Sequence, residues 1–359
     1  MPDVAYTLPE YTYNRLERLV DGIEAKPGKP VEIGAFAAME ANLKVRSVLG
    51  TLPNGLSDDD FVGILRLAML TECATETYGR AIGERARMFD ARWLERFNTN
   101  VWIPDELSHA TPYEMLLRDL GFAPAQLRRD IRETQQKAFE HKGGDTPVHV
   151  TAFGMIQEYL TDHWHGLIGG LLRPSSPDGS RLVRQVKRRE TLHTMWYRDM
   201  TALQVEAQPR YIAYVAEAMA QFEMPGNSLV PELQSQASRW LPLMNADFEQ
   251  LLRDLTRIIY EVMGNARSVG KLLGDLAAEL GIKLGPIPAR HLNAAISRLG
   301  GPGHGLLGEA LLERAGLRHL YQREPPNEAS HPVARLRALL RSWVARQMES
   351  RLDLARLAG

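Results

Sequence analysis

Two Glu-x-x-His tetrads in segments with helical patterning constrain the fold of this chain more than any other feature. Because residues three apart lie on the same face of an α-helix, each tetrad can direct a carboxylate and an imidazole toward one point. A helix-compatible segment with one further glutamate precedes each tetrad. The tetrads are Glu106/His109 and Glu190/His193, and the preceding glutamates are Glu72 and Glu158.

The order of these residues predicts two paired helices joined by a long crossover. Glu72 and Glu106 are 34 positions apart, Glu158 and Glu190 are 32 apart, and 49 positions separate His109 from Glu158. Four such helices place four carboxylates and two imidazoles around two metal ions, which is the ligand set of dinuclear carboxylate bundles. The sequence therefore predicts an all-α, four-helix metalloprotein that activates dioxygen.

Hard oxygen donors with one imidazole per ion suit two iron ions, and a manganese/iron pair would use the same ligands. We expect Glu106 and Glu190 to bridge the ions, with Glu72 and Glu158 as terminal ligands and one histidine, His109 or His193, on each ion. The alternative is a set of buried salt bridges, but arginines on the same helical faces are not evident.

Two similar tetrads are weaker candidates. Glu328/His331 lies in a Pro-flanked stretch, where no regular helix should run through and metal geometry is hard to preorganise. Asp162/His165 begins four residues after Glu158, so we expect it to support the site or the fold.

Composition excludes several other classes of protein. The chain has 359 residues, 43 Lys and Arg against 44 Asp and Glu, and a formal charge of −1, so no global basic field indicates nucleic-acid binding. The single cysteine, Cys73, excludes an internal disulfide and cysteine-based zinc patterns, and we expect it in the core. No signal sequence or apolar run of membrane-spanning length is evident, so we expect a cytoplasmic protein without a membrane span.

We expect three segments: residues 1–44 as an N-terminal arm and first helix, 45–284 as the metal-binding bundle, and 285–359 as a helical extension. Ser57 starts one helix that continues from Phe61 to about Met88, and the first helix is expected over 31–50. Further helices are expected from Thr146-Pro147, from 181 to beyond 203, and across 245–280, with a loop at 222–228. Pro104 and Pro112 predict a distorted helix around Glu106.

The chain resembles the soluble acyl-carrier-protein desaturases over about residues 45–280. The segment SDDDFVGILRLAMLTECATETY is similar to that family's first ligand helix, and Trp102 with Asp105-Glu106 and His109 is similar to its second motif. Gln157-Glu158-x-x-Thr161 followed by His165-Gly166 matches the third ligand helix, and FEMPG resembles the family's Met-Pro loop.

The resemblance implies a ferritin-like four-helix bundle with additional flanking helices and a di-iron oxidase or desaturase. It also implies an acyl chain carried on acyl carrier protein as substrate, a ferredoxin-type electron donor, and a homodimer. Thr161 corresponds to a threonine beside the oxygen-binding face, where its hydroxyl can deliver a proton. The local alternative is that this hydroxyl bonds back to the carbonyl of Gln157 or Glu158.

Several positions depart from the family pattern. Ser108 and Leu192 replace arginines before the two histidines, Ala110 replaces a glycine, and Arg189 stands where an aspartate is expected. The stripe Glu76, Arg80, Glu84 is either solvated or, if it faces inward, makes the substrate pocket polar.

Two other functions stay open. One is a biosynthetic di-iron oxygenase that hydroxylates or N-oxidises a polar or carrier-bound substrate, although Val186 occupies the position of the extra histidine of aryl-amine N-oxygenases. The other is a non-catalytic metal-binding bundle. A basic face is expected either to dock an acidic carrier or to be an ordinary solvated surface; it comprises Arg181, Arg184, Lys187, Arg188 and Arg189.

Overall fold

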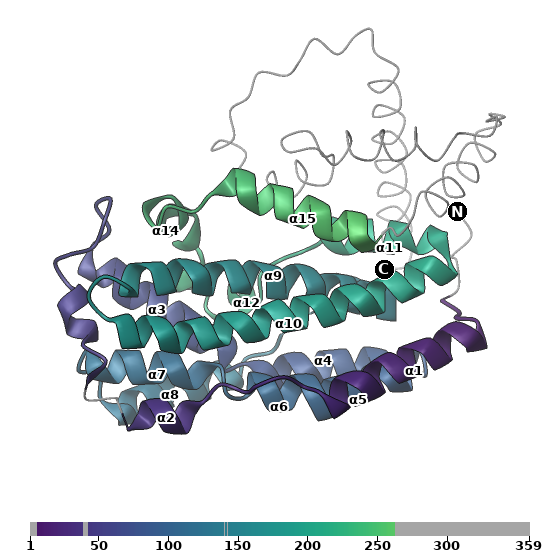
Figure 1. The fold of residues 1–359 in the computed structure, drawn as a ribbon, viewed down its shortest axis with the longest axis horizontal. Coiled ribbons are helices and arrows are strands. Elements are labelled where there is room, and N and C mark those ends of the chain that lie inside the picture. The colour runs from purple at the N-terminus through teal and green to yellow at the C-terminus, as the bar shows by residue number, and fades with distance from the viewer. Residues whose placement is uncertain (1–5, 39–41, 140, 142, 263–359) are drawn as a thin grey trace, which may run out of the picture. The chain divides into compact units, whose positions relative to one another are not determined.

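The computed structural model describes residues 6–38, 42–139, 141 and 143–262, and every regular element among them is helical (Figure 1). The prediction of an all-α chain is confirmed for this part. The expected extension over 285–359, with Glu328 and His331, lies outside the described residues.

The longer helices carry most of the structure. They are α1 (Glu10–Ala25), α3 (Asp58–Glu72), α4 (Thr75–Met88), α7 (Ala110–Asp119), α8 (Pro124–Gln135), α9 (Pro147–Leu172), α10 (Pro177–Ala207), α11 (Ile212–Ala220) and α15 (Phe248–Val262). Shorter elements connect them: α2 (Ile33–Ala37), α5 (Arg92–Phe97), α6 (Ile103–Glu106), α12 (Gly226–Leu229), α13 (Pro231–Gln234), α14 (Ala237–Leu243), the 3₁₀ turns η2 (Val45–Val48) and η4 (Pro209–Tyr211), and the π-helical turn η3 (Asn98–Trp102).

The chain divides into two compact units. One comprises 8–247 with 261–264 and contains all the predicted ligands. The other includes Phe248–Tyr260, so most of α15 belongs to it and is described separately. Since α1 and α2 lie in the first unit with the ligand helices, the structure shows no separate N-terminal unit ending at residue 44.

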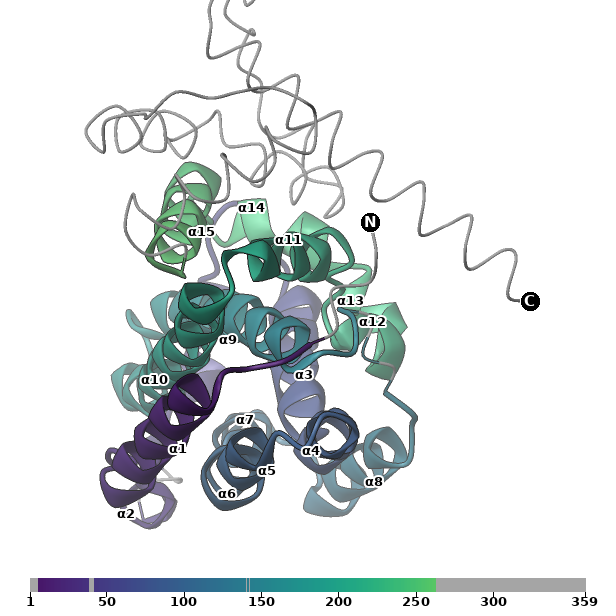
Figure 2. The same cartoon turned by 90° about the vertical axis from the view of Figure 1, so that its right-hand side faces the viewer.

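Four helical lines surround the interior of the first unit, as the end-on view in Figure 2 shows. The first is α3 followed by α4, the second runs from α5 to α7, and the third and fourth are α9 and α10. Contacts join α9 to α10, α10 to α7, α7 to α3, and α3 back to α9, which closes the ring. Apolar side chains such as Leu65, Met69, Leu116, Leu172 and Val183 fill its core.

Two helix starts follow the sequence signals closely. At Ser57, the hydroxyl oxygen accepts from the Asp60 backbone N–H while the Asp60 carboxylate accepts from the Ser57 N–H, both at 3.1 Å. Asp60 also accepts hydrogen bonds from Arg239 and Trp240, which connects α3 to α14. Thr146 opens α9 with the expected proline in the first turn.

The structure corrects two predicted helices. The predicted continuous helix over 31–50 is wrong, because the described residues of that stretch form the short α2 and η2 with non-helical residues between them, and the 16-residue α1 lies earlier in the chain. The single helix predicted from Phe61 to Met88 is interrupted after Glu72, so α3 ends there and α4 begins at Thr75. The Thr75 hydroxyl donates to the Glu72 carbonyl at 2.8 Å and thereby satisfies a group that the interruption leaves free.

Candidate metal centre

The four helical lines bring all six predicted ligands together in the interior. Glu72 ends α3, Glu106 ends α6 with His109 three residues later, Glu158 lies on α9, and Glu190 and His193 lie on α10. All six side chains are buried. Their donor atoms form two groups that could each hold a metal ion: Glu72, Glu106, His109 and Glu190, and Glu106, Glu158, Glu190 and His193.

A distorted helix positions the second pair of ligands, as the prolines predict. The π-helical turn η3 precedes Glu106, and a tight turn separates α6 from α7. In that turn the His109 N–H donates to the Glu106 carbonyl at 2.9 Å, and the Ser108 hydroxyl donates to the Asp105 carbonyl at 2.8 Å. Pro112 lies in the first turn of α7, where its missing N–H breaks no helical hydrogen bond.

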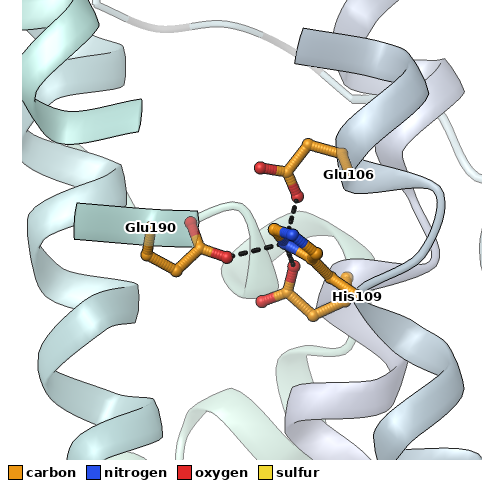
Figure 3. Close-up of side chains that lie close together, drawn as sticks. Glu106, His109 and Glu190 are labelled. Carbon is orange, nitrogen blue, oxygen red and sulfur yellow. Dashed lines mark ion pairs between the residues drawn. The ribbon is translucent and has the colours of Figure 1, made fainter. Parts of the chain in front are cut away.

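The two glutamates that both groups share lie between the two histidines. His109 Nδ1 is 2.8 Å from Glu190 Oε1 and 3.0 Å from Glu106 Oε2, as Figure 3 shows. His193 Nδ1 is 2.7 Å from Glu106 Oε1 and 3.7 Å from Glu190 Oε2. Glu106 and Glu190 therefore each present one oxygen to each histidine, which is the arrangement a bridging carboxylate requires.

The remaining two glutamates lie at opposite ends of this row. Glu72 Oε2 is 3.9 Å from His109 Nδ1, and Glu158 Oε2 is 3.8 Å from His193 Nδ1. Trp102 donates its indole N–H to Glu158 Oε1 at 3.0 Å, which fixes the orientation of that carboxylate.

Several of these donor atoms are buried and lack a hydrogen-bond partner among the described residues. They include Nδ1 of His109, Nδ1 of His193, Glu106 Oε1 and Glu190 Oε1. Buried polar atoms in proteins nearly always have a hydrogen-bond partner. A group of buried donor atoms that lie within about 3 to 4 Å of one another without such partners is therefore typical of a binding site for an ion. Divalent transition-metal ions such as ferrous iron and manganese bind carboxylate oxygens and imidazole nitrogens. The four carboxylates and two imidazoles of this cluster therefore fit two metal ions.

The electrostatics of the cluster support the same conclusion. Burial raises the pKa of Glu158 well above its usual range, and the nearby carboxylates of Glu106 and Glu190 raise it further. Burial alone would lower the pKa of His193, but Glu106 and Asp105 raise it well above its usual range. Buried carboxylates this close repel one another unless cations lie between them.

Sequence reasoning missed the role of Asp105 and Arg189. Asp105 Oδ2 is 2.7 Å from His193 Nε2 and 3.7 Å from His109 Nε2, so it faces the outer nitrogen of both histidines. The Arg189 Nε–H donates to the same oxygen at 2.7 Å. Arg189 was expected on a basic surface, but it is buried, and its other N–H groups donate to the carbonyls of Pro27 and Lys29.

The rest of the predicted basic face is only partly free. Arg181 pairs with Asp178, and Lys187 lies 2.7 Å from Asp162, whereas Arg184 and Arg188 are exposed. Carrier docking at this face stays a prediction.

The Thr161 hydroxyl makes the local back-bonds that the sequence left open, and it also lies near a candidate ligand. Its hydroxyl lies 3.0 Å from the Glu158 carbonyl and 3.1 Å from the Gln157 carbonyl, and 3.4 Å from Glu190 Oε2. The hydroxyl thus bonds back to its own helix while it stays within reach of a bridging carboxylate. Its catalytic role stays a prediction.

A small cavity of about 40 Å³ adjoins the carboxylates Glu72, Glu106 and Glu158. Its other walls include Tyr78, Gln157, Thr161, Met224 and Leu229. The Tyr78 hydroxyl and Gln157 Oε1 have no partner among the described residues, and burial raises the pKa of Tyr78 well above its usual range, so the hydroxyl stays protonated. Both residues line the cavity, although these two polar atoms are themselves buried.

The charged stripe of α4 does not line this cavity. Glu76, Arg80 and Glu84 are exposed, so the solvated alternative holds. Cys73 is buried next to Glu72, as predicted, and burial raises the pKa of its thiol to about 12, which makes it a core residue and a poor nucleophile.

Comparison with protein-family models and with curated proteins finds no match to this chain. Within the described part, no helix is both long and apolar enough to cross a membrane.

Proposed function

We propose that this protein binds two iron ions between α3, the α6–α7 turn, α9 and α10, and uses them in a dioxygen-dependent oxidation. The observation that carries the proposal is the convergence of two imidazole nitrogens and four buried carboxylates on two adjacent points. Both Nδ1 atoms and one oxygen each of Glu106 and Glu190 have no hydrogen-bond partner among the described residues. A manganese/iron pair would fit the same ligands. The ferritin-like bundle that the sequence resemblance implies belongs to this proposal.

The positions of the residues suggest a separate role for each in binding the two ions. Glu106 and Glu190 would bridge the ions, Glu72 and Glu158 would bind one ion each, and His109 and His193 would complete the two sites. Asp105 would hold the outer nitrogen of His193 at 2.7 Å, so that its Nδ1 faces inward, and its charge lies 3.7 Å from the outer nitrogen of His109. Thr161 is placed to pass a proton toward Glu190. Two iron ions here would supply the electrons that reduce dioxygen and the oxidising power that acts on substrate.

For the substrate, the resemblance to acyl-carrier-protein desaturases suggests an acyl chain on acyl carrier protein. That proposal brings with it a ferredoxin-type electron donor, a homodimer and a cytoplasmic location. The exposed cations Arg184 and Arg188 are the candidate contacts for an acidic carrier.

A second candidate, oxygenation of a small polar substrate, is favoured by the cavity. Its volume of about 40 Å³ accommodates a few small molecules of the size of water or dioxygen, whereas a long acyl chain would require its walls to move. The unpartnered Tyr78 hydroxyl and Gln157 carbonyl suit a substrate with hydrogen-bonding groups. Hydroxylation or amine N-oxidation belongs to this candidate.

Metal analysis tests the site, and product analysis tests the substrate. We expect the full chain, reconstituted with ferrous iron, to hold two irons and to consume dioxygen when reduced. Product masses from a panel of acyl carrier thioesters and small amines and phenols would separate the two substrate classes. Glu106→Ala should lose at least one ion because Glu106 belongs to both ligand groups.

Glu84→Ala is the matched control, since Glu84 is exposed on α4, and it should keep both ions. Two irons per chain with native absorbance in Glu106→Ala would disprove the ligand assignment.

A further inference from the structure

A third imidazole, that of His165, points into the carboxylate cluster. His165 lies on α9 seven residues after Glu158, which places it on the same face of the helix, and it is fully buried. Its Nε2 is 3.2 Å from Glu72 Oε1 and 3.7 Å from Glu190 Oε1. Both carboxylates belong to the group that contains His109.

The distance from this nitrogen to Glu72 falls in the range expected between two ligands of one ion. Donor atoms about 2.1 Å from a metal and at right angles to each other lie about 3.0 Å apart. His109 Nδ1 lies 2.8 Å from Glu190 and 3.0 Å from Glu106, and the 3.2 Å from His165 to Glu72 falls in the same range. Among the described residues His165 Nε2 has no hydrogen-bond partner, as is also true of Nδ1 in His109 and His193.

The opposite ring nitrogen of His165 is held from outside the cluster. Its Nδ1 forms a short hydrogen bond with the hydroxyl of Tyr113, a fully buried residue of α7. Metal-binding histidines usually have their second nitrogen fixed in this way, which sets the ring orientation and the tautomer. A tautomer with the proton on Nδ1 leaves the Nε2 lone pair directed at the carboxylates.

We propose that His165 Nε2 is a seventh ligand, bound to the same ion as Glu72 and His109. This inference rests on the proposed dinuclear site, but it requires only that the metals bind and does not depend on the reaction. One ion then has two imidazoles, and the other has His193 alone. The ion held by His109 and His165 would then have fewer open positions than the ion held by His193.

Selective isotope labelling separates His165 from the other histidines, since His109 and His193 present Nδ1 whereas His165 presents Nε2. The full chain is grown with histidine that carries ¹⁵N only at the ε position, loaded with ferrous iron, and partly oxidised to its paramagnetic mixed-valent form. Electron–nuclear double resonance should then detect a strongly coupled ¹⁵N from a directly bound Nε2. The remote nitrogens of the other two ligands give only weak coupling.

The strong signal should disappear in His165→Gln and persist in His163→Gln, a control two residues away on the same helix. If His165→Gln fails to fold, the comparison of ε-labelled with δ-labelled histidine in the parent protein still shows whether an Nε2 atom binds iron. Iron bound with strong coupling only from δ-labelled histidine would overturn the seventh ligand and leave the dinuclear site intact. A chain that binds no iron would overturn both proposals.

Discussion

At the scale of single residues, Asp105 links the two halves of the candidate centre. One carboxylate oxygen faces the outer nitrogens of both His109 and His193, so the two rings share a single anchor. The buried Arg189 compensates the negative charge of this carboxylate, and the two histidines help to hold its pKa below the usual range despite its burial. Asp105 therefore orients His193 through a hydrogen bond and places a negative charge near the outer nitrogen of His109.

Asp105→Asn should keep the shape of this anchor and remove its charge. We expect metal affinity to fall by about 10- to 100-fold, the usual cost of losing a partner of a ligating histidine. Competition with a chelator of known affinity measures this loss. Asp130→Asn is the control, because Asp130 pairs with Arg66 from α8, a helix that carries none of the predicted ligands. Equal affinities in the two variants would show that the carboxylate charge does not orient the histidines.

Thr161→Val should preserve helix shape and iron content but remove the hydroxyl that lies 3.4 Å from Glu190. If this hydroxyl delivers protons, dioxygen consumption becomes uncoupled, so that hydrogen peroxide release per dioxygen consumed rises. An oxygen electrode with a peroxide assay measures the ratio. If the valine variant releases no more peroxide than the parent, the hydroxyl serves only to bond back to its helix.

At the scale of elements, the start of α3 positions a ligand at its far end. The capping box at Ser57 and Asp60 fixes where α3 begins, and Glu72 is its last residue. The Asp60 carboxylate also binds Arg239 and Trp240, so the same helix start is tied to α14. A change at this cap should affect the stability of the helix more than the geometry of the ligands.

Ser57→Ala should destabilise the protein by about 1 kcal/mol, the typical cost of losing a serine N-cap. Urea unfolding should show a lower midpoint with an unchanged slope, while iron content stays at the parent value. Ser235→Ala, which removes an exposed hydroxyl on the turn after α13, should change stability by less than about 0.5 kcal/mol. A loss of iron in Ser57→Ala would mean that the cap and the site are not separable.

Sequence alone predicted those elements whose signals are local. The caps at Ser57 and Thr146 lie within one turn of the helices they start, and helical spacing brought six distant ligands to one interior. The interruption after Glu72 and the location of α1 depend on tertiary packing, which local propensity does not encode. Arg189 was misjudged for a related reason, because only the folded chain shows that Asp105 faces it. The contact between Tyr113 and His165 could not be read from the sequence either.

At the scale of the whole molecule, folding of the first unit places four carboxylates in one buried cluster. Ionised groups in such an environment are costly unless cations or hydrogen bonds compensate them. Because the unfolded chain does not bring the four helical lines together, it cannot bind two ions in the same way. We therefore expect metal binding and folding to be linked.

Removing iron with a chelator should lower the melting temperature, and reloading should restore it. At free iron 100 times the dissociation constant, one site contributes about 2.7 kcal/mol, which corresponds to a shift of several degrees for a unit of this size. Calorimetry of chelated and reloaded protein measures the shift. Glu106→Ala should show a smaller response, and an identical melting temperature with and without iron would contradict the linkage.

The contacts of Arg189 with the carbonyls of Pro27 and Lys29 also limit how this chain can vary over evolution. Backbone atoms of the segment between α1 and α2 make these contacts. Gly28, which has a positive φ and leaves no room for a side chain beside Arg189, must therefore stay glycine, whereas the contacts themselves do not depend on which side chains flank it. An insertion or deletion there would instead move the carbonyls and leave a buried guanidinium without acceptors. Related chains should therefore keep the length of this connection more strictly than its residues other than Gly28, although it lies far from every ligand helix in the sequence.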